Sequence, residues 1–315
     1  MGMEAQHVEF QAAFTAAATA PDRAGISTPC VSVIVPSHNA AASITGCLDA
    51  LLHQSHADLE VLVCDDGSTD NTVDLVAAIE DPRVSLLCSA LKRGSSAARN
   101  RGIRSAKGEI IFFTDADVEV DRDWVRNGLL YFDDETLLGI EGQVVYVSDD
   151  YSPQYSDRIV QNLHGGQYMT ANAAYRRDAL LAVGLFSEQN GNYEDRDLAI
   201  RLRRYGRIAF AHDARARHVR ERYSVRTFMH EATKVGRRLN VEHVHEERVF
   251  TRVGPIVRPP HLLAILFPPL ILAKLFTDRP RSVRDVLMLL LVYPRLLRER
   301  CVIWSWALRN RRLLI

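Results

Sequence analysis

Short apolar runs alternate with helically spaced segments along the first third of the chain. The runs are rich in β-branched and aromatic residues, which is typical of strands buried on both faces of a parallel sheet. Between the runs, apolar residues recur every three or four positions, as on one face of a helix. This rhythm predicts an α/β fold with a doubly wound, mostly parallel sheet that carries its functional residues at the carboxyl edge. The predicted strands are 30–36, 59–64, 84–88 and 109–114, and the predicted helices are 43–54, a segment ending near 79, and 94–106.

Two carboxylates follow the fourth predicted strand directly. Asp115 and Asp117 are separated only by Ala116, so both side chains are expected at the carboxyl edge of the sheet. Carboxylates this close repel each other unless a cation or a proton intervenes. Mg²⁺ or Mn²⁺ meets this need, because such an ion takes one or two carboxylates and completes its shell with water and phosphate oxygens. The alternative is a pair of acids in a solvated turn.

The second predicted strand also ends in acid, at Asp65-Asp66. An Asp at this position can accept hydrogen bonds from a ribose diol or a base N–H, so Asp66 would select a nucleoside. The other interpretation is an Asx-type turn that caps the next helix. Neither G-x-G-x-x-G after the first strand nor G-x-x-x-x-G-K-[ST] is present, so a dinucleotide fold and a P-loop are not supported.

The net charge of zero conceals an uneven distribution of charge. Residues 1–200 hold 14 Lys and Arg against 30 Asp and Glu, which leaves 25 against 9 for residues 201–315, so the two parts carry −16 and +16. The basic part therefore favours contact with a polyanion or an anionic surface.

The cysteines and the apolar pattern suggest a compartment and three regions. The five cysteines are odd in number and lack ligand spacing, which indicates a reducing compartment, and no signal-peptide pattern is present, so we expect a cytoplasmic protein. Residues 1–28 are expected to form a flexible leader, residues 29–240 the α/β domain, and residues 241–315 a helical, basic and apolar extension.

The extension contains apolar runs at 261–276, 286–293 and 302–308. None reaches the roughly 20 residues of a spanning helix. Flanking Arg residues, together with Trp304 and Trp306, favour a peripheral or re-entrant position on the cytoplasmic face of an anionic membrane. A soluble helical subdomain or a dimer interface is the alternative.

Five sequence blocks occur in one order, and their combination is more specific than any one of them. They are VSVIVPSHN, VLVCDDGSTDNT, RGSSAARNRGIRSAKGEIIFFTDADV, NAAYRRDALLAVGLF and NYEDRDLAIRLRRYG. With these blocks the chain resembles the family 2 glycosyltransferases of the GT-A fold over about residues 30–220. The resemblance implies an inverting, hexosyltransferase-type enzyme of cell-surface polysaccharide or glycolipid synthesis, which moves a sugar from a nucleoside diphosphate sugar to a hydroxyl acceptor with the help of Mn²⁺ or Mg²⁺.

The resemblance also implies roles for residues of the donor site. Arg99 is expected to approach the base or the diphosphate, and many relatives carry Tyr at the position of His38. Asp117 is expected to coordinate the metal ion with Asp115 and with His218, which stands where a late histidine often completes the site; His212 is close by. The residues expected to bind the nucleotide-sugar are Pro36, His38, Asn39, Asp66, Arg99 and Asp115.

On the acceptor side, the resemblance implies that Asp195 is the general base. Glu194 either shares this work or raises the pKa of Asp195 through like-charge repulsion. A helix N-terminus that favours acids, worth about 0.3–1 kcal/mol, is the structural interpretation of the same pair. Residues 151–172 lack periodicity, and Gly166 and Asn172 are assigned to an acceptor-side loop that orders over the donor, with an ordinary surface loop as the alternative.

Two other classes of function remain as alternatives. A sugar-nucleotide nucleotidyltransferase of similar architecture usually has a glycine-rich, basic loop after the first strand, and VPSHNAAAS is not such a loop. A non-catalytic protein that binds a nucleotide or a polyanion would leave the acidic motifs without a role. No nucleic-acid partner is expected, because the basic part lacks interleaved aromatic residues on a recognisable module.

Overall fold

The computed structural model describes residues 10, 12, 31–147, 161–189, 193–219, 283 and 290–309. The chain divides into two compact units, which are described separately: residues 1–147 with 160–219, and residues 148–159 with 220–315.

The two boundaries expected between regions, after residue 28 and after residue 240, lie outside the described residues. Of the expected leader, residues 1–28, only Phe10 and Ala12 are described. Phe10 is buried, and its ring stacks on Tyr205 with the two centroids 4.0 Å apart, so this residue is part of the first unit's core.

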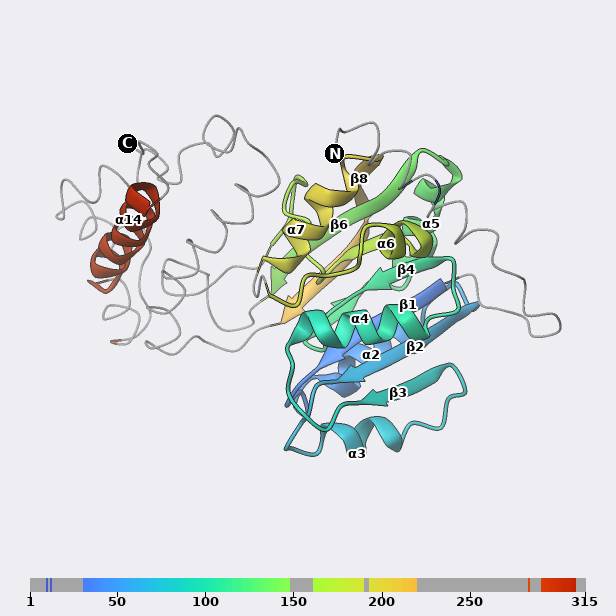
Figure 1. The fold of residues 1–315 in the computed structure, drawn as a ribbon. Coiled ribbons are helices and arrows are strands. Elements are labelled where there is room, and N and C mark those ends of the chain that lie inside the picture. Colours follow the sequence, from blue (N-terminus) through green and yellow to red (C-terminus); the bar gives the residue numbers. More distant parts are fainter. Residues whose placement is uncertain are drawn as a thin grey trace. The chain divides into compact units, whose positions relative to one another are not determined.

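The first unit is an eight-stranded sheet with helices on both faces (Figure 1). The early elements follow the predicted rhythm and differ from it by one or two residues at most ends. In chain order they are β1 (Val31–Ser37), α2 (Ile44–Leu52), β2 (Leu59–Asp65), α3 (Thr72–Ala77), β3 (Val84–Cys88), α4 (Ser95–Ser105), β4 (Ile110–Phe113), β5 (Val118–Val120), α5 (Trp124–Leu129), η1 (Leu130–Asp133), β6 (Leu137–Val147), β7 (Ala173–Arg176), α6 (Arg177–Ala182), α7 (Glu194–Leu202) and β8 (Arg207–Val219).

The strand order is β3-β2-β1-β4-β7-β6-β8-β5. Strands β3, β2, β1 and β4 are parallel, whereas β7 is antiparallel to β4 and to β6; β8 is parallel to β6, and β5 is antiparallel to β8. The predicted α/β class with a mostly parallel sheet is confirmed. The strands predicted from the sequence did not include β5 and β7, which pair in antiparallel fashion.

Neighbouring residues of the central strands belong to opposite layers of the core. Val33 of β1 packs in a cluster with α2, α3 and α5, whereas Ile34 packs in a second cluster with α4, α6 and α7. This burial on both faces is the reason that the strands appear as continuous apolar runs. Trp124, at the start of α5, is fully buried and meets Phe112 edge to face at 4.9 Å between centroids.

The parallel register brings the ends of β1, β2 and β4 to one edge of the sheet. Ser37 pairs with Asp65, and Ile34 pairs with Phe113. The Asp66 N–H also donates to the Ser37 carbonyl at 2.8 Å, which extends the β1–β2 contact by one residue. The acidic residues after β2 and β4 are therefore neighbours in space although about 50 positions separate them in the sequence.

Strand β8 accounts for part of the basic second half. Along it, Ala214 and Ala216 are buried while Arg215 and Arg217 are exposed, which is the alternation of a strand with one solvated face. His218 at its end is buried and pairs in register with Val118 of β5. This pairing brings the histidine next to the Asp-Ala-Asp turn.

In the second unit, the structure describes the helix α14 (Val292–Arg309). The expected apolar run 261–276 lies outside the described residues, and the first half of the run 286–293 does as well. Among the described helices, none combines the length and the apolar character needed to cross a membrane.

Candidate functional site

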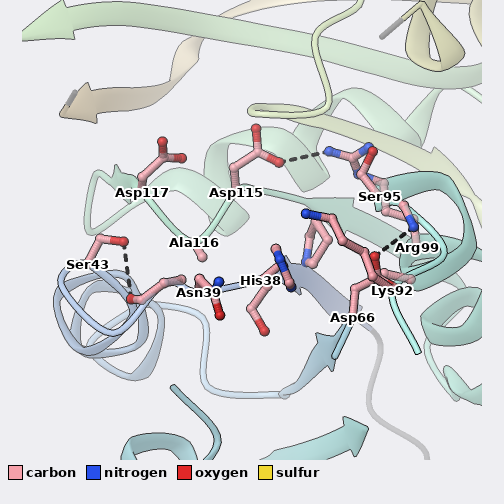
Figure 2. Close-up of a pocket in the computed structure, with 15 residues that line it drawn as sticks. His38, Asn39, Ser43, Asp66, Lys92, Ser95, Arg99, Asp115, Ala116 and Asp117 are labelled. Atoms are coloured by element: carbon pink, nitrogen blue, oxygen red, sulfur yellow. Dashed lines mark hydrogen bonds and ion pairs between the residues drawn. The ribbon is translucent and has the colours of Figure 1, made fainter. Parts of the chain in front are cut away.

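A pocket of about 410 Å³ lies at the carboxyl edge of the parallel strands (Figure 2). Its wall is formed by the turn after β1, the residue that follows β2, the loop that leads into α4 together with the first part of that helix, and the Asp-Ala-Asp turn after β4. The residues expected from the sequence that line it are Pro36, His38, Asn39, Asp66, Arg99, Asp115 and Asp117. Sequence reasoning missed four further polar lining residues, Ser37, Ser43, Lys92 and Ser95.

The Asp66 carboxylate holds the loop that leads into α4. Its two oxygens accept hydrogen bonds from the backbone N–H groups of Arg93 (2.9 Å) and Gly94 (2.6 Å). Gly94 has a φ of +100°, which a residue with a Cβ rarely adopts. Each carboxylate oxygen can accept a second hydrogen bond, so Asp66 can fix this loop and still bind a ligand N–H or hydroxyl.

Other acids form the turn that the sequence suggested for Asp66. The Asp65 carboxylate accepts a hydrogen bond from the Ser68 N–H at 2.9 Å, and the Asp70 carboxylate accepts one from the Thr72 N–H at 3.1 Å. The alternative interpretation, an Asx-type turn that caps the next helix, therefore holds only in part: neighbours of Asp66 make the turn, and the N-cap residue of α3 makes no side-chain capping hydrogen bond.

The side chain of Asn39 makes hydrogen bonds within the protein, whereas one ring nitrogen of His38 makes none to a described residue. Asn39, with a φ of +53°, accepts the Thr69 N–H on its Oδ1 at 2.8 Å and so ties the turn after β1 to the turn after β2. The His38 Nδ1 is buried and makes no hydrogen bond to a described residue. The His38 ring lines the pocket, and its Nδ1 is a polar atom that the described residues leave without a partner.

Arg99 joins the two acidic motifs instead of pointing freely at a donor. Its Nη2 donates to the Asp115 Oδ1 at 2.8 Å (Figure 2), and its Nη1 donates to the Glu194 Oε1 at 3.1 Å. The Ser95 hydroxyl donates to the same Glu194 oxygen at 2.8 Å. Because the Arg99 side chain is only 5% exposed, these are buried, charge-assisted contacts. Arg99 thus bridges the two acidic motifs, while each of its terminal nitrogens retains a second N–H. Its expected contact with the base or the diphosphate stays a prediction.

Asp195 has the electrostatics of a proton acceptor near neutral pH. Loss of solvent around the carboxyl group raises its pKa to about 7, and the neighbouring Glu194 charge adds to this, while the backbone N–H of Arg196 and the Arg99 guanidinium oppose it. Like-charge repulsion by Glu194 is thus one of three causes that raise the pKa of Asp195, after burial and ahead of the more weakly acting charge of Asp115. A group with a pKa close to the working pH is well suited to general-base catalysis.

The Asp-Ala-Asp turn and the end of β8 bring together the groups expected to hold a metal ion. The His218 Nε2 lies 3.6 Å from the Asp117 Oδ2, whereas His212 is exposed beside Asp213. Asp115 gives one oxygen to Arg99. Across the described ranges, no cluster of three or more His, Cys, Asp or Glu ligands is formed. Asp117 and His218 fit a divalent ion that takes its other ligands from water and a diphosphate.

The loop before β7 is held by one buried carboxylate, Glu141 of β6. Three consecutive backbone N–H groups, those of Gly166 (2.5 Å), Gln167 (3.0 Å) and Tyr168 (2.8 Å), donate to it, as does the Asn162 amide at 2.9 Å. Gly166 has a φ of +82°, and a Cβ at this position would meet no atom within 4 Å. Gly166, the glycine expected on the acceptor side, therefore lies in a loop that hydrogen bonds to Glu141 hold in place.

Asn172, also expected on the acceptor side, is only 2% exposed. Its Oδ1 accepts the Trp124 Nε1–H at 2.8 Å, and its Nδ2 donates to the carbonyls of Gln143 (2.9 Å) and Ala214 (2.8 Å). The amide thus braces α5, β6 and β8 from inside. An acceptor would find no exposed amide at this residue.

We expect Glu141→Gln to loosen the Gly166–Tyr168 loop. The amide replaces one acceptor oxygen by an NH₂ that faces buried N–H donors, and each lost charged hydrogen bond is worth about 1.5–3 kcal/mol. Amide hydrogen exchange at residues 166–168 should accelerate by roughly tenfold or more. Glu135→Gln is the matched control, because Glu135 is exposed. Unchanged exchange in the Glu141 variant would contradict the anchoring role.

Comparison with known proteins gives both a family and a fold. The model of the family described as "Glycosyl transferase family 2" matches residues 32–184. Over 142 residues the chain is 32% identical to UDP-Glc:α-D-GlcNAc-diphosphoundecaprenol β-1,3-glucosyltransferase WfgD of Escherichia coli, covering 45% of this chain and 53% of that protein. Over 194 residues it is 31% identical to chondroitin synthase of Pasteurella multocida, covering 57% of this chain and 19% of that protein. The chain thus spans about half the length of the first of these relatives and about a fifth of the second.

Solved structures show the same architecture. One is a mannosyltransferase of Pyrobaculum calidifontis in complex with GDP-Man and Mn²⁺, with a TM-score of 0.57, 21% identity, and coverage of 96% of this chain and 99% of that chain. Another is S. aureus TarS 1–349 in complex with UDP-GlcNAc, with a TM-score of 0.53, 19% identity, and coverage of 90% and 92%. At these identities the likeness establishes the fold, and the expected GT-A architecture is confirmed.

Proposed function

We infer that this chain, whose residues 32–184 belong to glycosyl transferase family 2, moves a sugar from a nucleoside diphosphate sugar to a hydroxyl acceptor with inversion at the anomeric carbon. This match confirms the family resemblance over the first three sequence blocks and most of the fourth, and it ends before the fifth block, NYEDRDLAIRLRRYG. One observation carries the finer proposal: a single pocket holds Asp66 and the Asp115–Asp117 pair, and Arg99 connects that pair to Glu194-Asp195. These contacts support the proposal, because one arginine links the residues proposed to bind the donor to the proposed proton acceptor.

The pocket is suited to a nucleoside diphosphate. Its volume of about 410 Å³ falls in the range of small-molecule sites. Asp66 and the His38 ring can take the hydrogen-bonding edge of the nucleoside, while the Lys92 ammonium on the same wall offers positive charge to phosphate oxygens.

Asp117 and His218 would hold a divalent ion, with Asp115 beside them. When bound, such an ion would neutralise the negative charge that develops on the leaving diphosphate. Arg99 keeps Asp115 in place from the other side through the 2.8 Å contact. A bound cation and the Arg99 guanidinium would together offset the negative charge of Asp115 and Asp117.

Asp195 would accept the proton of the acceptor hydroxyl as that oxygen attacks the anomeric carbon. The attack breaks the bond to the diphosphate oxygen in one displacement, and no residue of the chain needs to form a covalent intermediate. A single displacement from the face opposite the leaving group inverts the configuration. Its pKa of about 7 allows Asp195 to be ionised before the reaction and protonated after it.

The acceptor is proposed from the relatives. The E. coli relative is named for an acceptor that consists of GlcNAc linked through diphosphate to undecaprenol, and the P. multocida relative for a polysaccharide. We therefore propose a glycan or a lipid-linked sugar as the acceptor, reached in the cytoplasm or at the cytoplasmic face of a membrane.

Calorimetric titration of the full chain with UDP, GDP, dTDP and CDP, each with Mn²⁺ and with EDTA, tests this function. We expect one nucleotide to bind in preference to the others and to bind more weakly in EDTA. Binding of a nucleoside triphosphate together with no binding of any diphosphate would favour the nucleotidyltransferase alternative. No binding under any condition would remove the basis of the donor-site assignment.

The variant Asp117→Ala should lose the metal-dependent part of nucleotide binding. An ion-mediated contact to the diphosphate is worth at least as much as a charged hydrogen bond, so affinity in Mn²⁺ should fall by roughly tenfold or more. Affinity in EDTA should stay at the wild-type EDTA value. Asp123→Ala is the matched control, because Asp123 is exposed and its side chain caps no helix N–H. Equal loss in both variants would contradict the specific role of Asp117.

A further inference from the structure

An apolar stripe runs along the exposed side of α14. Its residues follow the spacing i, i+4, i+7 and i+11, which places them on one side of a helix. Trp304 is 51% exposed and Leu308 is 80% exposed, whereas Ile303 and Trp306 are buried on the other side. The residues of this α14 stripe are Leu297, Cys301, Trp304 and Leu308, all of them exposed.

The structure separates two tryptophans that the sequence treats alike. Trp304 and Trp306 were both expected at the depth of lipid headgroups, but Trp306 is only 7% exposed. Residues i and i+2 of a helix are about 200° apart around its axis, so they cannot share one face. Trp304 is therefore the tryptophan of the α14 stripe, and Trp306 belongs to the buried side.

Positive charge borders the α14 stripe. Arg298 and Arg309 are exposed and follow Leu297 and Leu308 directly in the sequence. The acid of this helix, Glu299, lies on the inward side, where burial raises its pKa. The exposed side of α14 thus combines apolar side chains with arginines and carries no carboxylate.

We propose that the α14 stripe docks the protein on a membrane surface rich in anionic lipid headgroups. A helix with this pattern lies in the plane of the interface: leucines reach the boundary of the acyl chains, tryptophan lies at headgroup depth, and arginines contact phosphates. Interfacial binding also agrees with the finding that no described helix is suited to cross a bilayer.

A second copy of the chain is the less suitable occupant. Two α14 stripes packed together would bring the bordering arginines, Arg298 and Arg309, of both copies towards one interface. No carboxylate of the exposed side of α14 would offset their repulsion. Charge complementarity therefore favours lipid phosphates over a self-association that uses this face.

Membrane docking goes beyond the proposed transferase function and is tested without it. The full chain is sedimented with vesicles of phosphatidylcholine, with and without phosphatidylglycerol. We expect binding to the anionic vesicles, weakened by salt, because screening acts on exposed charges. The double variant Trp304→Ser/Leu308→Ser should lower the partition coefficient by roughly tenfold or more, since each buried apolar side chain contributes to binding.

The matched control is Leu130→Ser, which removes an exposed leucine (65%) of the first unit. Its partition coefficient should equal that of the wild type. The proposal is overturned if the folded wild type does not bind anionic vesicles, or if the double variant binds as well as the wild type. It is also overturned if the double substitution dissociates a dimer, measured by light scattering, while vesicle binding is absent.

A conservative pair of variants guards against an effect on folding. The chain has three tryptophans, Trp124, Trp304 and Trp306, and Trp124 is fully buried. Brominated lipid should quench the fluorescence of the Trp306→Phe variant, which retains Trp304, and leave that of the Trp304→Phe variant nearly unchanged. The reverse pattern would assign the lipid contact to the inward side of α14 and contradict the α14 stripe.

Discussion

Asp195→Asn is expected to lower the turnover number by about 10²–10⁴-fold, because the variant can no longer take the acceptor proton. Nucleotide affinity should not change, since Asp195 does not line the pocket. The measurements are steady-state kinetics with the donor identified by titration, and calorimetry with its nucleotide.

Asp178→Asn is the matched control for this prediction. Asp178, like Asp195, accepts the backbone N–H of the following residue at 2.7 Å, and burial also raises its pKa. It lies at the start of α6 and should not affect turnover. Wild-type turnover in the Asp195 variant would remove Asp195 from the role of general base.

The raised pKa of Asp195 predicts how both the reaction rate and the stability of the protein change with pH. The pKa of Asp195 in the folded protein, about 7, lies above its ordinary value of 3.8, so the rate should rise with pH through about 7. The stabilisation that protonated Asp195 contributes is fully present below pH 3.8 and is lost as the pH rises through about 7. Over this range the free energy of unfolding should fall by an amount on the order of 2–4 kcal/mol. Asp195→Asn should remove both the rise in rate and this loss of stability, which denaturation at pH 5 and pH 8 can measure.

Arg99→Met is expected to destabilise the folded protein by about 3 kcal/mol, because it leaves the buried Glu194 carboxylate and the partly buried Asp115 carboxylate without their cation. Asp115 and Glu194 both lose a hydrogen-bonded partner. The pKa of Asp195 should rise further, since Arg99 is one of the groups that lower it. Urea denaturation measures the first effect, and a shift of the rate profile to higher pH measures the second.

Two further variants test whether the effects of Arg99→Met come from the loss of its two carboxylate contacts. Arg99→Lys should recover part of the stability, because one ammonium cannot reproduce two contacts that use separate guanidinium nitrogens. Arg104→Met, on the exposed side of the same helix, should change neither stability nor pH profile. If Arg99→Met weakens nucleotide binding while stability and pH profile stay normal, Arg99 is a donor contact and not the link between the motifs.

The sequence by itself determined the first half of the sheet and the chemistry at its edge. Apolar runs and helical spacing are local properties, so they predicted β1 to β4 and the intervening helices to within a few residues. The parallel arrangement then required the acids after β2 and β4 to meet, and Asp66, Asp115 and Asp117 do line one pocket. The motif blocks added the family, and the match to residues 32–184 confirms it.

Only the tertiary structure decided which atoms those residues face. Arg99 meets Glu194 across 95 positions of sequence, Asp66 uses its carboxylate on a backbone loop 27 and 28 positions away, and Asn172 is enclosed by three elements. Periodicity reports which side of an element is buried, but it carries no information about partners brought together by packing. Trp304 and Trp306 show the same limit at short range. The sequence places two tryptophans two positions apart, but it does not say which of them is buried. A helix turns about 100° per residue, so the two lie on opposite sides, and packing in the folded protein buries Trp306 and leaves Trp304 exposed.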